Sequence, residues 1–176
     1  IINYDFYSKA ELVLCQSSFH KDIVEKNLKL NNILSLGGNL WSLKSLEKIR
    51  EISRKKKNGK CAVMNSIIGH KNTSGAVRFC KYKNLEFGLV NSAPYFQFLE
   101  DLGSYEKLIF LPETPETLSR IVVEARMMGM SVVTNNLIGA AYETWFSKKG
   151  EELIKYMERK RNDIPNMVLK RLNILL

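Results

Sequence analysis

Two glutamates, Glu116 and Glu124, lie eight positions apart in the stretch 112–133. If an α-helix begins near Thr117, the second carboxylate lies within about 80° of the first around the axis and about 12 Å further along it. The free amides of the first helical turn would lie between them, where they favour phosphate or hydroxyl oxygens. This spacing therefore suits a nucleotide sugar, with the ribose at Glu124 and a hexose at Glu116.

The same spacing also suits a helix that binds nothing. In that interpretation Glu116 stabilises the positive end of the helix dipole, and Glu124 forms an ion pair with Arg120 or Arg126. Spacing alone favours this second interpretation. The choice between them depends on the elements that surround the pair.

Short apolar segments alternate with helical patterns along the chain. The segments are continuous apolar runs, which is typical of a parallel sheet covered on both faces. We therefore expect an α/β fold with a doubly wound, mainly parallel, Rossmann-like sheet and helices on both faces. Strands are predicted at residues 11–15, 32–38, 61–66, 85–90, 107–112 and 131–134, and helices at about 18–27, 42–57, 73–83, 94–106, 117–128 and 150–161, with Pro165 interrupting the last helix or starting another.

Ligands of such sheets bind outside the carboxyl ends of the strands. Five predicted strands end in polar or glycine-rich segments, which we expect to share one rim: 37–39, 65–71, 91–93, 112–116 and 135–143. The sequence contains no G-x-G-x-x-G, no P-loop and no G-x-S-x-G motif. Dehydrogenase, NTPase and esterase functions are therefore disfavoured.

The stretch LPETPETLSRIVVEARMMGMSVVTNNLIGAAYE, residues 111–143, resembles the donor-binding half of retaining GT-B glycosyltransferases. That large family (family 4-like, group 1) includes sucrose synthases and many bacterial sugar transferases. The matching features are a strand ending at Pro112, Glu116 followed by Glu124-Ala125, Gly129 before Val132-Val133, and Gly139 followed by Glu143. AELVLCQSSF, NILSLGGN and the pair His70-Lys71 also match, so the resemblance covers nearly the whole chain.

The resemblance implies one half of a GT-B fold. Residues 1–40 would be the closing segment of the N-terminal acceptor domain with the hinge, and residues 41–176 the nucleotide-sugar-binding domain. Glu116 would bind the transferred sugar, Lys71 the diphosphate and Glu124 the ribose. The remaining donor-binding positions would be Ser66, His70, Asn91, Thr117, Leu118, Ser119 and Gly139, with no metal and no cofactor beyond the nucleotide sugar, such as a UDP-, GDP- or ADP-sugar.

The chain departs from the family pattern at two places. Thr117-Leu118-Ser119 replaces the usual Gly-Phe-Gly, and Ser66 replaces a phosphate-binding arginine, for which Arg78 or Arg120 could compensate. Because most of the acceptor domain is missing, we expect the chain to come from a longer protein and to be inactive by itself. The alternative is a non-catalytic module that binds a nucleotide sugar or phosphate.

The net charge of +9 favours an anionic partner. Nucleic acid is not expected, because the chain has no nucleic-acid-binding motif, and a basic nucleic-acid-binding domain is the least favoured alternative. Cys15, Cys61 and Cys80 are an odd set without metal-ligand spacing. We expect free thiols and a cytoplasmic location, with the basic segment 54–60 making peripheral contact with anionic lipid at the inner membrane face.

Overall fold

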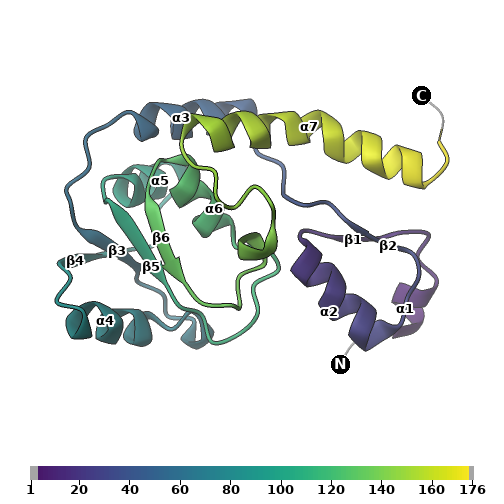
Figure 1. Ribbon diagram of the computed structural model, residues 1–176, viewed down its shortest axis with the longest axis horizontal. Helices are drawn as coiled ribbons and strands as arrows, with labels where there is room; N and C mark the ends of the chain where they lie inside the picture. Colours follow the sequence, from purple (N-terminus) through teal and green to yellow (C-terminus); the bar gives the residue numbers. More distant parts are fainter. Residues whose placement is uncertain (1–3, 175–176) are drawn as a thin grey trace.

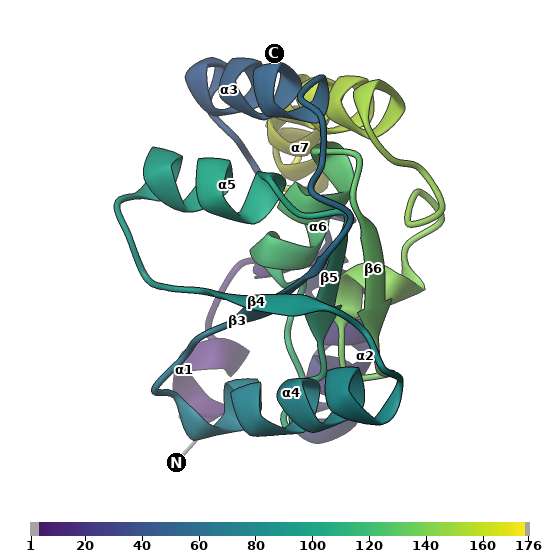
Figure 2. The ribbon, with the colours of Figure 1, turned by 90° about the vertical axis from the view of Figure 1, so that its left-hand side faces the viewer.

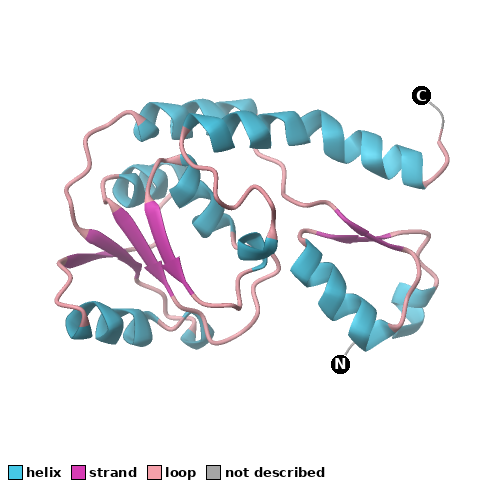
Figure 3. Ribbon diagram, in the orientation of Figure 1, coloured by secondary structure: helices cyan, strands magenta, loops and turns pink. Residues whose placement is uncertain are grey.

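The computed structural model describes residues 4–174, which form two parallel sheets (Figure 1, Figure 3). The larger sheet has the order β4-β3-β5-β6, and all its neighbouring strands are parallel. Its strands are β3 (Cys61–Met64), β4 (Phe87–Val90), β5 (Lys107–Phe110) and β6 (Ser131–Thr134). The smaller sheet pairs β1 (Val13–Cys15) with β2 (Ile33–Ser35).

Helices cover both faces of the larger sheet (Figure 2). One face is covered by α4 (Thr73–Tyr82). On the other face lie α3 (Leu43–Ser53), α5 (Tyr95–Gly103), α6 (Arg120–Met127) and α7 (Glu151–Arg171). The smaller sheet is flanked by α1 (Tyr4–Ser8), which the sequence pattern did not predict, and by α2 (Ser18–Leu28). The predicted α/β, doubly wound, Rossmann-like fold is confirmed.

Local sequence signals explain where several helices begin. Ser17, Ser42 and Asn72 each accept a backbone amide of the following helix through their side chains. The apolar side chains Leu46, Ile49 and Ile52 form a buried stripe on α3. Each cap satisfies a free amide, and the stripe fixes which face of α3 meets the core.

The core has separate parts that follow the two sheets. The largest cluster lies between the larger sheet and α3, α5, α6 and α7, and includes Trp41, Phe110 and Trp145. A second cluster joins the other face of that sheet to α4. Cys15, Leu28, Leu30 and Ile33 form a third cluster under the smaller sheet. The expected domain division at residue 40 stays a prediction.

Two expectations about the ends of strands and helices were wrong. Gly37 follows β2 and therefore belongs to the smaller sheet, so only four of the five polar segments share the rim of the larger one. Pro165 neither ends nor restarts a helix, because α7 runs through it. Pro165 is exposed whereas the preceding Ile164 is buried, so packing of α7 outweighs the one backbone hydrogen bond that proline removes.

The close packing of α3 against α5 gives a stability prediction. A Cβ atom on Gly103 would lie 2.2 Å from Ile52 Cγ2 and 2.8 Å from Met128 Sδ. Gly103→Ala should therefore lower the free energy of unfolding by about 1–3 kcal/mol, measured by urea denaturation. The control is Gly69→Ala, where a Cβ would meet no atom within 4 Å. Equal stability of the two variants would contradict the packing described here.

Candidate functional site

The strand order of the larger sheet has a switch point between β3 and β5, where consecutive crossovers leave toward opposite edges of the sheet. From β3 the chain passes by α4 to β4 on one side, and from β5 it passes by α6 to β6 on the other. Lys71 lies in a short 3-10 turn after β3 (η1, Gly69–Lys71), and Glu116 lies in the segment after β5. Lys71 Nζ is 2.5 Å from Glu116 Oε1. The two predicted catalytic side chains thus meet at the switch point, where ligands of such sheets bind.

This ion pair is only partly exposed to solvent. The Lys71 side chain is 23% exposed and that of Glu116 is 15% exposed. Lys71 Nζ also lies 5.8 Å from the centre of the Phe110 ring. The pair therefore forms a defined contact between two loops rather than a mobile surface pair.

The segment after β5 is fixed to the segment after β6 by the backbone. The Glu116 amide donates to Leu137 O, the Gly139 amide to Glu116 O, and the Ala140 amide to Leu118 O. A Cβ atom on Gly139 would lie 2.1 Å from Thr117 O. Gly139 is buried, so it lets the two segments approach closely and offers no side chain to a ligand.

The helix that carries Glu124 begins three residues later than expected. Residues 116–118 run alongside 137–140, and those backbone hydrogen bonds keep them out of the helix, so α6 starts at Arg120. Leu118 is fully buried, and Ser119 has φ = 70°. No described residue accepts a hydrogen bond from the amides of Thr117, Leu118 or Ser119.

The delayed helix start also corrects the geometry expected for the two glutamates. The helical spacing of about 12 Å does not apply, because only the second half of the interval is helical. Glu116 and Glu124 instead have separate surroundings.

Glu124 is nearly buried, with a side chain 4% exposed. Its Oε1 accepts hydrogen bonds from Trp41 Nε1 at 2.9 Å and from the Tyr95 hydroxyl at 2.8 Å. Arg120 Nη2 lies 3.3 Å from the same oxygen. No described residue donates to Oε2. Burial and the neighbouring Glu124 raise the pKa of Tyr95 to about 12, so its hydroxyl remains a donor at neutral pH.

Of the two ion-pair partners considered for Glu124, the structure selects Arg120. Arg126 donates instead to the carbonyl oxygens of Ser147 and Lys148. The interpretation of Glu124 as an ion-paired helix residue is thus correct. One of its carboxylate oxygens has no donor among the described residues.

The other predicted site residues lie along the same rim. Asn91 Oδ1 accepts a hydrogen bond from Asn65 Nδ2 at 2.7 Å, which joins the ends of β4 and β3. The Ser66 hydroxyl accepts the Ile68 amide, and exposed His70 uses its carbonyl to accept the Glu113 amide. A cavity of about 350 Å³ lies beside them, lined by Met64, Asn65, Ser66, Ser92, Ala93, Tyr95 and Phe98.

A slightly larger cavity of about 390 Å³ lies between α3 and α5, and Lys48 and Glu51 belong to its lining. These two side chains form an ion pair with each other, at 3.3 Å. The cavity at the rim of the sheet is lined by uncharged polar and apolar side chains and lies beside the other predicted site residues, so it is the better candidate for a nucleoside.

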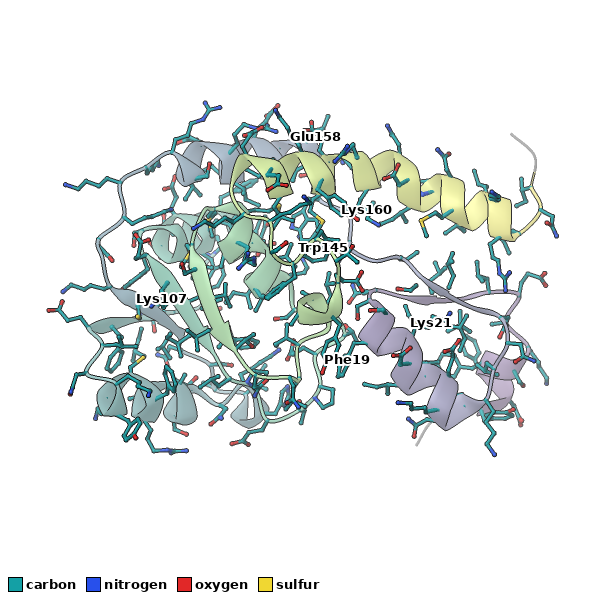
Figure 4. The ribbon with its side chains drawn as sticks, in the orientation of Figure 1. Phe19, Lys21, Lys107, Trp145, Glu158 and Lys160 are labelled. Carbon is teal, nitrogen blue, oxygen red and sulfur yellow. The ribbon has the colours of Figure 1, made fainter. Side chains whose placement is uncertain are left out.

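The start of α2, next to the smaller sheet, makes contacts with the same region. Ser17 Oγ donates to Thr117 O, the Ser18 amide donates to Glu143 Oε1, and Phe19 stacks on Tyr142 with ring centres 4.8 Å apart. Figure 4 shows Phe19, Trp145 and Lys160 along the boundary between the two parts. The N-terminal segment is therefore held against the loops that carry the candidate site.

Sequence reasoning missed Trp41 and Tyr95 as site residues. Trp41 lies 83 positions from Glu124 and Tyr95 lies 29 positions from it, so no local spacing links them. Only general chemistry could have pointed to them. A carboxylate on a helix that packs against the core needs buried hydrogen-bond donors, and the indole of Trp and the phenol of Tyr can supply them.

The described residues provide neither a metal-binding cluster nor a helix able to cross a membrane. Residues 4–174 bring together no group of three or more His, Cys, Asp or Glu side chains that could hold a metal ion. None of the helices in that range is both long and apolar enough to span a bilayer. Cys15, Cys61 and Cys80 are free and buried, as predicted.

Comparison with known proteins finds similarity among solved structures. No model of a known protein family matches the chain, and no curated protein matches it. Among solved structures, a glycosyltransferase from Rickettsia africae ESF-5 has a TM-score of 0.50 and 15% sequence identity over 99% of this chain. The match covers 60% of the other chain. The protein therefore has a glycosyltransferase-like fold and spans about three-fifths of that relative's length.

The backbone of Ser119 gives the prediction for this site. A non-glycine residue at φ = 70° costs about 1–2 kcal/mol, and the Ser119 hydroxyl is buried without a partner among the described residues. Ser119→Gly should raise the free energy of unfolding by about 1 kcal/mol in urea denaturation, after the entropy cost of glycine is subtracted. Ser104→Gly is the control, because Ser104 has φ = −72° and should gain nothing. A loss of stability in Ser119→Gly would contradict the assigned backbone.

Proposed function

We propose that the chain is the donor-binding domain of a retaining glycosyltransferase of the GT-B type, which binds a nucleotide-diphosphate sugar. The observation that carries the proposal is the Lys71–Glu116 contact of 2.5 Å at the switch point, beside three amides for which residues 4–174 provide no acceptor. A cation, free amides and a carboxylate at one place match a ligand in which phosphate and sugar hydroxyls are neighbours. The glycosyltransferase-like fold supports the same conclusion.

In this proposal the ligand replaces contacts that the free protein makes with itself. The diphosphate takes Lys71 from Glu116, and the released Glu116 carboxylate accepts hydroxyls of the transferred sugar. The bond between the anomeric carbon and the diphosphate oxygen then breaks, and the electron pair leaves with the diphosphate. A hydroxyl of the acceptor forms the new bond to the anomeric carbon, and its proton passes to the departing diphosphate oxygen. Lys71 stabilises the charge that develops on that leaving group.

The nucleoside would lie further along the rim. The cavity of about 350 Å³ is lined by Tyr95, which also contacts Glu124. A heterocycle in this cavity would bring its ribose near Glu124, where Oε2 is the acceptor not used by described residues. The amide and hydroxyl groups at the ends of β3 and β4 would then contact the base and phosphates.

The acceptor side would come from the remainder of a longer protein. Residues 4–40 would belong to that side, in keeping with a match that covers 60% of the solved glycosyltransferase. The basic segment 54–60 carries less free charge than its sequence suggests, because Lys55 pairs with Glu100 and Lys60 with Glu86. Membrane contact and a cytoplasmic location are therefore expectations that this proposal does not need.

A second function is a module that binds nucleotide sugar or phosphate without catalysis. It is favoured by Ser66, which engages its own turn where the family has a cation, and by the side chains at Thr117 and Ser119 where the family has glycine. Both functions require nucleotide binding, and they differ in turnover by the full-length protein.

Ribose recognition can be tested at Glu124. Glu124→Gln retains an acceptor for Trp41 and Tyr95 but removes the charge, so affinity for a ribonucleoside diphosphate should fall roughly tenfold. Affinity for the 2′,3′-dideoxy analogue should not change further. Calorimetry with the UDP, GDP and ADP series measures both values. Exposed Glu113 provides the control variant Glu113→Gln. Equal losses for the two analogues would mean that Glu124 acts through the fold and not on the ribose.

The two-domain requirement gives a further prediction. The isolated chain should bind a nucleoside diphosphate but should transfer no sugar, because the proposal places most of the acceptor side of the cleft on other parts of a longer protein. A radiolabelled-donor assay with the chain alone measures this, with calorimetric binding in the same preparation as the control. Robust turnover by the isolated chain would refute the requirement.

A further inference from the structure

Arg120 is the first residue of α6, at the positive end of the helix dipole. A cation there is unfavourable, and the first turn of α6 contains no acidic residue to offset it. The three preceding amides, of residues 117–119, have no acceptor among the described residues. Positive charge and unused donors therefore accumulate at one point of the chain.

The Arg120 guanidinium is held in a defined orientation by groups from three elements. Its Nε and Nη2 lie 3.4 and 3.3 Å from Glu124 Oε1. Its central carbon lies 5.1 Å from the centre of the Trp41 ring and 6.0 Å from that of Tyr95. Such stacking fixes the plane of a guanidinium at a low cost in side-chain entropy.

The outer part of the same guanidinium is open. The Arg120 side chain is 46% exposed, and no described residue hydrogen-bonds to Nη1. Glu124 Oε1 already accepts two shorter hydrogen bonds from Trp41 and Tyr95. The long contact with Glu124 thus orients Arg120 while leaving donors free for an oxyanion.

A second unsatisfied group lies at the same turn. Ser119 is more than nine-tenths buried, and its hydroxyl oxygen has no hydrogen-bond partner within the described part of the chain. Unsatisfied polar groups of this kind are uncommon and call for an explanation in terms of a ligand or strain. An anion bound at the start of α6 would accept hydrogen bonds from these unused donors and from the open side of the Arg120 guanidinium.

The other candidate for a second cation is Arg78. It lies on α4, which covers the opposite face of the sheet from α6 (Figure 2). Arg78 is exposed, and no aromatic ring or carboxylate among the described residues orients it. The surroundings of Arg120 are those of an oriented anion-binding group, and the surroundings of Arg78 are not.

We propose that Arg120 and Lys71 together bind the diphosphate of the donor, so that Arg120 supplies the charge that Ser66 lacks. Lys71 approaches from the loop after β3 and Arg120 from the start of α6, with the amides of residues 117–119 between them. This inference rests on the proposed function. It predicts that the site binds nucleoside diphosphates more tightly than nucleosides, because the Lys71 ammonium and the Arg120 guanidinium both contact the diphosphate.

The test is calorimetric titration of the wild-type chain, Arg120→Gln, Arg120→Lys and Arg78→Gln with UDP, GDP, ADP and the parent nucleosides. Arg120→Gln should weaken diphosphate binding by about 10- to 100-fold, the value of a charge-assisted hydrogen-bonded contact, and should change nucleoside binding less than about twofold. Arg120→Lys keeps a counter-charge for buried Glu124 and should lose about 3- to 10-fold, because a point charge replaces the planar fork. Arg78→Gln, with the same charge change, should match wild type.

The outcomes separate this inference from the proposed function. If the wild-type chain binds no nucleoside diphosphate, the proposed function fails and this inference fails with it. If the wild type binds but Arg120→Gln does not differ from it, or if Arg78→Gln carries the loss, only the role of Arg120 is overturned. Equal losses for diphosphate and nucleoside would also overturn it, because the effect would then pass through Glu124. If Arg120→Gln does not fold, Arg120→Lys decides by the same criteria.

Discussion

The carboxylate of Glu124 is carried into the core by α6, and the surrounding elements are arranged to satisfy it. Trp41, just before α3, and Tyr95, at the start of α5, both donate to its Oε1, and Arg120 provides the opposite charge. The Trp41 carbonyl in turn accepts a hydrogen bond from Arg161 of α7. A buried carboxylate without such partners would cost several kcal/mol. The need to pair the Glu124 carboxylate therefore connects α5, α6, α7 and the segment before α3 through hydrogen bonds near the rim of the sheet.

Both glutamates are paired within the protein itself, and this has a consequence for binding. Glu116 is bound to Lys71, and Glu124 to donors through one oxygen. Under the proposed function a ligand would exchange these existing charge contacts for new ones, so the net gain in affinity would be smaller than the sum of the new contacts. The exchange also favours ligands that supply both an anion for Lys71 and hydroxyl donors for Glu116. A nucleotide sugar has both groups, whereas inorganic phosphate has only the first.

The sequence predicted those features that depend on local patterns. The strands of the larger sheet lie where the short apolar runs predicted them. The start of α6 could not be predicted in this way, because the segment 116–118 is held by backbone hydrogen bonds to 137–140. Trp41 and Tyr95 were missed for the same reason, since their partner lies far along the chain. At Pro165 the local rule for proline gave way to packing of α7 on the core.

The most direct test of the account is an NMR titration of the isotope-labelled chain with UDP, GDP and ADP, followed through backbone amides and the Trp41 indole N–H. The account predicts saturable shifts for at least one nucleotide, concentrated at residues 66–71, 91–95 and 116–124, with a change at the Trp41 indole because it donates to Glu124. The absence of saturable shifts with every nucleotide would contradict it, as would shifts confined to the basic segment 54–60. Shifts that appear only with duplex DNA and vanish as salt rises would point to nucleic-acid binding instead.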